Sequence, residues 1–178
     1  TWMIRATSLQ PDDIHQIIVE WAEAGRPFAI ASVLEAQGST PRKAGTKAVI
    51  DAAGCIYGTI GGGQVEAQAQ RLAIEAIRRG RAASFAVNLD AGAVEQGKPI
   101  CGGRMRVLLD PAPNLHRAAY AAALESRRRR KPGVLLTTFR GGRKPQVKVQ
   151  FLPASAISPA MKRPGMKAAL LALESGQA

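Results

Sequence analysis

The stretch from Tyr57 to Gly80, YGTIGGGQVEAQAQRLAIEAIRRG, constrains the fold more than any other part of the chain. A short apolar run leads through three glycines into a segment with one apolar face, formed by Val65, Ala69, Leu72, Ala73, Ala76 and Ile77. This spacing predicts a helix buried on one side and ending at Gly80. Because Gly61, Gly62 and Gly63 precede the helix N-terminus, the stretch also predicts an anion site. The structural alternative is a turn that only connects strand and helix.

The remaining patterns predict alternating helices and strands. Helices are expected over 11–25, 114–130 and 165–175, and strands over 28–35, 46–51, 55–60, 84–89, the stretch after Cys101, 133–139 and 146–152. We therefore predict an α/β fold, a single domain with a mixed β-sheet, flanking helices and no C-terminal Rossmann domain. Residues 1–112 form its core, and residues 113–178 form a basic helix-strand-strand-helix extension that completes the same domain.

The positive charge of the chain is concentrated in its last third. Residues 1–115 hold 12 Lys/Arg and 11 Asp/Glu, whereas residues 116–178 hold 13 and 2, which together give the net +12. The densest run is Arg127 to Lys131. Such a block attracts nucleic acid, an acidic protein face or anionic lipid, but it is equally consistent with a solvated surface. The charges are not interleaved with aromatic residues that would stack on bases, which disfavours nucleic acid.

Hydropathy indicates a cytoplasmic protein without a membrane partner. No apolar run approaches the roughly 20 residues that span a bilayer, and the N-terminus lacks a basic region followed by an apolar stretch. Thr1 fits either removal of an initiator Met or a trimmed start. The two cysteines, Cys55 and Cys101, are too few for a disulfide scaffold and lack zinc-ligand spacing.

Two further segments carry chemistry. The loop QGSTPRKAGTK at 37–47 offers the hydroxyls of Ser39 and Thr40, the rigid Pro41 and the charge of Arg42, as a functional loop or an ordinary hairpin connection would. In ICGGRMRVLLDP at 100–111, the arginines that follow Cys101, Gly102 and Gly103 favour the thiolate of Cys101. A small buried hydrophobic residue is the alternative reading of this cysteine.

Taken together, GSTPRKAG at 38–45, GTIGGGQVE at 58–66 and CGGRMRV at 101–107 resemble the XdhC/CoxI family of bacterial-type accessory proteins for molybdenum hydroxylases. The resemblance covers roughly residues 10–112. It implies a protein that binds molybdenum cofactor (molybdopterin) as cargo, protects it during sulfuration with a cysteine desulfurase, and passes it to an apo molybdenum hydroxylase such as xanthine dehydrogenase. The matching positions are Ser39, Thr40, Pro41, Arg42, Gly61, Gly62, Gly63, Glu66, Cys101, Gly102 and Gly103.

The chemistry of these residues agrees with that cargo. A helix N-terminus and Arg42 suit the phosphate of molybdopterin, Glu66 suits N–H groups of a ligand, and a soft Cys101 thiolate suits a molybdenum contact. No turnover is required, so we expect a binding and transfer protein and not an enzyme. Longer family members continue into a Rossmann domain, but no GxGxxG follows residue 112.

Two alternative functions stay open at this point. The chain is also consistent with a basic nucleic-acid- or protein-binding module whose glycine loops are structural. An enzyme acting on a phosphorylated or nucleotide substrate is a further reading, although neither histidine in the chain lies in a motif. A homodimer is compatible with either function.

Overall fold

The computed structural model describes residues 13–89 and 102–157 of the 178-residue chain. The chain divides into two compact units, one formed by Thr1–Ile14 with Pro27–Ala112 and the other by His15–Arg26 with Pro113–Ala178. Among the described residues, no helix is both long and apolar enough to cross a membrane.

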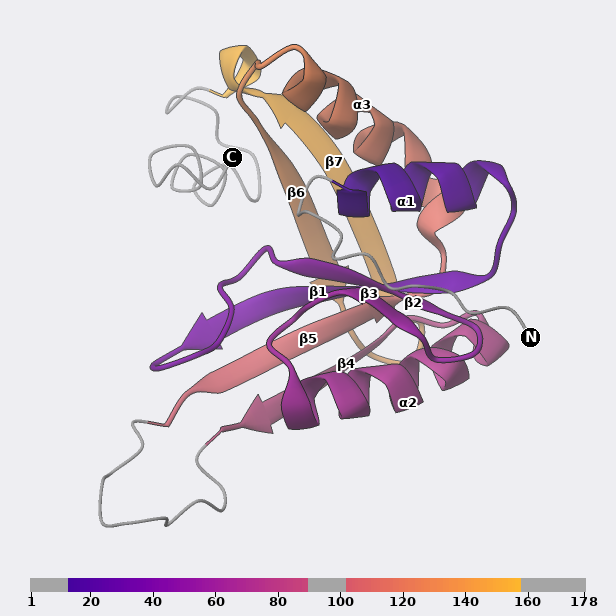
Figure 1. Ribbon diagram of the computed structural model, residues 1–178, viewed down its shortest axis with the longest axis vertical. Helices are drawn as coiled ribbons and strands as arrows, with labels where there is room; N and C mark the ends of the chain where they lie inside the picture. The colour runs from indigo at the N-terminus through magenta and orange to yellow at the C-terminus, as the bar shows by residue number, and fades with distance from the viewer. Residues whose placement is uncertain (1–12, 90–101, 158–178) are drawn as a thin grey trace, which may run out of the picture. The chain divides into compact units, whose positions relative to one another are not determined.

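The first unit is built on a five-stranded antiparallel sheet in the order β3-β2-β1-β5-β4 (Figure 1). Its strands are β1 (Phe28–Gln37), β2 (Lys47–Asp51), β3 (Ile56–Gly58), β4 (Ala83–Asn88) and β5 (Arg104–Asp110). The central strand β1 is buried without interruption from Phe28 to Val33. The strand expected over 28–35 is therefore confirmed, and burial on both faces agrees with its mostly apolar sequence.

Helix α2 (Gly63–Arg79) covers one face of this sheet (Figure 1). Its buried residues are Val65, Ala69, Ala73 and Ala76, the stripe expected from the sequence. They pack with sheet residues such as Ala31, Val33 and Val107. Gly80 is the C-cap residue that ends the helix, as predicted, and its φ of 60° is left-handed.

The second unit contains a two-stranded antiparallel sheet of β6 (Gly133–Arg140) and β7 (Gln146–Pro153). Helix α3 (Arg117–Arg128) contacts both strands, and most of α1 (Asp13–Glu23) belongs to the same unit. The short 3₁₀ helices η1 (Pro113–His116) and η2 (Ala154–Ala156) precede α3 and follow β7. Tyr120 of α3 is buried, and its ring centroid lies 6.1 Å from that of His15.

The α/β class with flanking helices is confirmed, while several details differ from the prediction. Every strand pair in the described residues is antiparallel. The strand expected over 55–60 is only Ile56–Gly58, because Gly58 has a φ of 80° and leaves the extended conformation. His15 is half-buried beside Tyr120. The helix expected over 165–175 lies outside the described residues.

Candidate functional site

The loop that follows β1 packs directly against the two glycines that precede β5. A methyl group added to Gly38 would lie 2.7 Å from the carbonyl oxygen of Gly102. A methyl group added to Gly103 would overlap the carbonyl oxygen of Ser39 and lie 2.8 Å from Cγ2 of Thr40. Gly103 is buried, so neither backbone has room to move away easily. Only a residue without a side chain fits at this crossing.

The same loop contacts, on its other side, the turn formed by Gly61, Gly62 and Gly63, which we call the glycine turn. A methyl group added to Gly61 would lie 2.6 Å from Cγ of Pro41 and 3.9 Å from Cγ of Arg42. Gly61 also has a φ of 131°, which disfavours any residue with a side chain. Residues 38–42 therefore lie between the glycine turn and Gly102–Gly103 of the CGGRMRV motif. The structure thus brings the described parts of the three motifs together at one end of the sheet (Figure 1). Cys101 lies outside the described residues.

Glu66 holds the glycine turn together from the first turn of α2. Its Oε1 accepts hydrogen bonds from Oγ1 of Thr59 at 2.6 Å, from the Gly62 N–H at 2.9 Å and from the Ile60 N–H at 3.1 Å. Partial burial raises the pKa of Glu66, but donation from the Thr59 hydroxyl and from the N–H groups of Gly62, Ile60 and Gly61 outweighs it, so the pKa is lowered overall. The carboxylate is therefore held ionised as part of the turn.

This arrangement changes which groups are open to an anion. The Gly61 N–H donates to Oγ1 of Thr59 at 3.2 Å and the Gly62 N–H donates to Glu66, so the turn uses both donors itself. The N-cap residue Gly62 supplies no side-chain cap. Since the first N–H groups of a helix have no partner within it, the donors facing outward are those of residues 63–65. The N–H groups of Gly61 and Gly62 are thus engaged within the turn, whereas those of residues 63–65 have no partner within the helix.

Thr59 is a further residue of the site, and it was not predicted from the sequence. Its hydroxyl both donates to Glu66 and accepts from Gly61, and so it links the end of β3 with the start of α2. The signal for it is the separation of seven residues between Thr59 and Glu66 across the three glycines, GTIGGGQVE. A hydroxyl and a carboxylate on either side of a glycine turn satisfy N–H groups that the turn leaves unpaired.

The exposed charge near the site is mainly positive. Arg42 and Lys43 are exposed in the loop, and Arg104 is exposed where β5 begins. Lys47, at the end of the same loop, is half-buried, and its Nζ donates to the carbonyl oxygen of Gly45 at 3.2 Å. Burial lowers the pKa of Lys47 to about 8. With Glu66 engaged in the turn, these cations favour an anionic ligand.

Metal ligands are sparse in the part of the chain that the structure describes. It contains no group of three or more His, Cys, Asp or Glu side chains placed to hold a metal ion. Cys55, which is described, is exposed and free. The predicted molybdenum contact at Cys101 therefore stays a prediction.

Comparison with known proteins identifies the segment that carries this site. Residues 21–88 match the XdhC and CoxI family. This segment belongs to that family. It includes the loop at 38–45 and the glycine turn, which are two of the three motifs on which the resemblance was predicted.

Two known proteins are similar to parts of this chain. The uncharacterized protein YqeB of Escherichia coli K12 is 32% identical over 87 residues, which are 49% of this chain and 16% of YqeB. A crystal structure described as a xanthine dehydrogenase from Bacillus halodurans has a TM-score of 0.58 and 18% identity, over 79% of this chain and 42% of that one. The latter likeness shows a shared fold. The chain spans less than half the length of these two relatives.

Proposed function

We propose that this chain is an accessory protein for the maturation of a molybdenum hydroxylase such as xanthine dehydrogenase. It binds molybdenum cofactor as cargo where the motifs at 38–45, 58–66 and 101–107 meet, which we call the three-motif site. The observation that supports this most is the packing of residues 38–42 between Gly61 and Gly103. Three segments separated by tens of residues in the sequence meet in one place, within and beside a segment of the XdhC and CoxI family. A purely structural set of turns would not need to meet.

The described residues fit the anionic end of such a cargo. Arg42 is exposed and makes no hydrogen bond or ion pair with the described residues, and its guanidinium can hold a phosphate through two parallel hydrogen bonds. The N–H groups of residues 63–65 supply further donors at the positive end of α2. Both features belong to the first unit.

The remaining parts of the cargo are assigned to the other two motifs. Only Oε1 of Glu66 takes part in the turn, which leaves Oε2 as an acceptor for N–H groups of a pterin. The thiolate of Cys101 is a soft ligand for the metal end of the cargo. On this proposal the protein hands the cofactor to an apo molybdenum hydroxylase after sulfuration with a cysteine desulfurase, and it catalyses no turnover of its own.

The proposal is tested by co-expressing the chain with the cofactor biosynthesis machinery and measuring molybdenum and pterin in the purified protein. Arg42→Gln is compared with Arg71→Gln, which removes one exposed cation from α2 away from the loop. Cys101→Ala is compared with Cys55→Ala, since Cys55 is exposed in the link between β2 and β3. We expect Arg42→Gln and Cys101→Ala to lose cofactor and both controls to retain it. Absence of molybdenum and pterin from the native chain would contradict the function itself.

A further inference from the structure

Helix α3 ends in a turn whose geometry is unusual for its sequence. The Lys131 N–H donates to the carbonyl oxygen of Ser126 and the Arg130 N–H to that of Arg127, both at 2.8 Å. This pair of hydrogen bonds is the Schellman motif, in which the residue after the C-cap is left-handed and is usually glycine. Here that residue is Arg130, with a φ of 52°. In the described residues it is the only non-glycine with a positive φ.

The local structure does not require an arginine at this position. Glycine or asparagine adopts the left-handed conformation with little strain, whereas arginine does so at a cost. Arg127 and Arg128 already place positive charge in the last turn of α3, where it complements the helix dipole. An unfavourable backbone conformation that persists points to a role for the side chain that it presents. The side chain of Arg130 is exposed.

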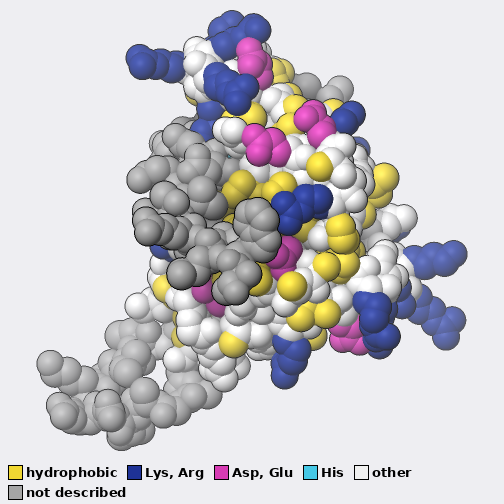
Figure 2. Space-filling view, turned by 45° about the vertical axis from the view of Figure 1, so that its right-hand side comes forward, with side chains coloured by type: hydrophobic (Ala, Val, Ile, Leu, Met, Phe, Trp, Pro, Cys, Tyr) yellow, Lys and Arg dark blue, Asp and Glu magenta, His cyan; other side chains and the backbone are white. Residues whose placement is uncertain are grey.

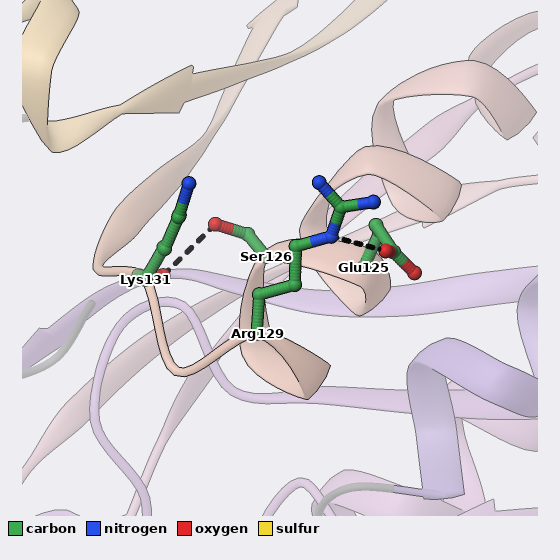
Figure 3. A network of polar contacts seen from close by, with 4 residues as sticks. All are labelled: Glu125, Ser126, Arg129 and Lys131. Atoms are coloured by element: carbon green, nitrogen blue, oxygen red, sulfur yellow. Dashed lines mark hydrogen bonds and ion pairs between the residues drawn. The ribbon is translucent and has the colours of Figure 1, made fainter.

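The neighbours of Arg130 leave much of the positive charge at this turn uncompensated. Arg129 pairs with Glu125, and the Ser126 hydroxyl donates to the carbonyl oxygen of Lys131 and fixes the turn (Figure 3). Arg128, Arg130 and Lys131 are exposed, and their side chains make no hydrogen bond or ion pair with the described residues. Lys and Arg side chains project into solvent over this end of α3, at the top of the view (Figure 2).

We propose that the α3 cap, Arg127 to Lys131, is a docking surface for an acidic segment of a partner protein. Guanidinium groups bind carboxylates through two parallel hydrogen bonds, and the turn presents several of them from a fixed backbone. The proposal is independent of cofactor binding at the glycine turn. It assigns a partner chemistry to the positive charge that is concentrated in the last third of the chain.

Two observations favour an acidic protein over a nucleic acid. This unit has a second basic group at the opposite end of β6, formed by Arg140, Arg143 and Lys144. Seven residues of β6, at about 3.3 Å each, separate this group from the α3 cap by about 23 Å. Between them β6 carries no Lys or Arg, and the one basic residue of the paired strand β7 is Lys148, opposite Thr138 and near the second group. The strand pairs from Gly133 to Thr137 carry no positive charge, so no continuous track for phosphates joins the two groups. Tyr120 is buried, and Phe139 and Phe151 are half-buried, so these aromatic rings form no open platform for bases.

The test measures binding of the full chain to a fluorescent peptide of alternating glutamate and glycine, and to a fluorescent single-stranded DNA, by anisotropy at low and physiological salt. Arg130→Gly removes the side chain and relieves the strained φ, so the variant stays folded while losing one contact. We expect about fivefold weaker binding of the peptide. Arg117→Gln serves as the matched control, because Arg117 is exposed at the other end of α3 and its loss changes the net charge equally.

The outcomes separate the explanations. Weaker peptide binding by Arg130→Gly with native binding by Arg117→Gln supports the docking surface. Equal losses in both variants would show that net charge alone attracts the peptide, and unchanged binding in Arg130→Gly would remove the cap from the interaction. DNA binding that is tighter than peptide binding at the same salt, and that Arg130→Gly weakens, would assign the surface to nucleic acid and overturn the proposal.

Discussion

Replacing Glu66 with glutamine tests whether an ionised carboxylate holds the glycine turn. Glutamine keeps the length of the side chain and an acceptor oxygen, but it removes the charge from three hydrogen bonds of 2.6 to 3.1 Å. A hydrogen bond to a charged group contributes about 1.5–3 kcal/mol and a neutral one about 0.5–1.5 kcal/mol. Because Glu66 is partly open to solvent, the upper end of that difference does not apply. We expect Glu66→Gln to lower the free energy of unfolding by about 1–2 kcal/mol at neutral pH.

The lowered pKa of Glu66 determines in which direction stability changes with pH. The pKa of Glu66 in the folded protein lies below its ordinary value of 4.5, so the unfolded chain binds more protons in that range. The stabilisation is therefore present above pH 4.5 and is lost as the pH falls through the folded-state pKa. Denaturant unfolding followed by circular dichroism, from neutral to acid pH, should show the native and Glu66→Gln curves converging at low pH.

Hydrogen exchange of residues 59–66 locates the effect in the turn, where faster exchange is expected in Glu66→Gln. Glu75→Gln is the matched control, since Glu75 lies on the same helix and makes one exposed pair with Arg79 at 2.6 Å. That change should cost only about 0.5 kcal/mol. Equal stability of Glu66→Gln and the native chain at neutral pH, or a difference that persists unchanged into acid, would refute the role of the charge.

Three further changes follow from backbone strain and burial. Gly61→Ala should destabilise the first unit by about 2 kcal/mol, and by more than Gly63→Ala. Both glycines have positive φ, but only a methyl at Gly61 meets Pro41, at 2.6 Å. Equal losses of stability in urea melts would show that the contact with Pro41 costs nothing. Arg130→Gly should raise the stability of the second unit by about 1 kcal/mol by removing the strain at φ 52°, and a thermal melt without any gain would show that the turn is unstrained. Since burial lowers the pKa of Lys47 to about 8, native stability should rise with pH between about 8 and the ordinary lysine value of 10.5, and Lys47→Met should lack that rise; the same slope in both proteins would contradict the assignment.

The sequence predicted the elements of the first unit well because each has a local cause. The apolar stripe from Val65 to Ala76 defined the buried face of α2, and Gly80 defined its end. The sequence also singled out residues 38–42 and both glycine motifs, and the structure places residues 38–42 beside both of these motifs. The hydrogen bonds of the turn were not predictable in this way. Whether Gly62 donates to a ligand or to Glu66 depends on how β3 and α2 meet, which no local pattern encodes.

The second unit illustrates the same limit. His15 is half-buried because Tyr120, over a hundred residues later in the chain, lies beside it, and Nη1 of Arg127 lies 3.3 Å from its Nδ1. The sequence predicted the positive charge of the arginines that follow Glu125. It did not predict the left-handed conformation of Arg130, because no glycine marks the end of α3.

The claim that the three motifs form one cargo site is tested most directly by the cofactor content of Gly103→Ala. A methyl at Gly103 would displace the Ser39 backbone, whereas Gly141→Ala adds a methyl in ordinary contact with Phe139 at 3.7 Å in the other unit. Molybdenum and pterin are measured per chain after co-expression, with circular dichroism to confirm folding. We predict that folded Gly103→Ala loses most of its cofactor while Gly141→Ala retains the native amount. Native cofactor content in Gly103→Ala would contradict the account.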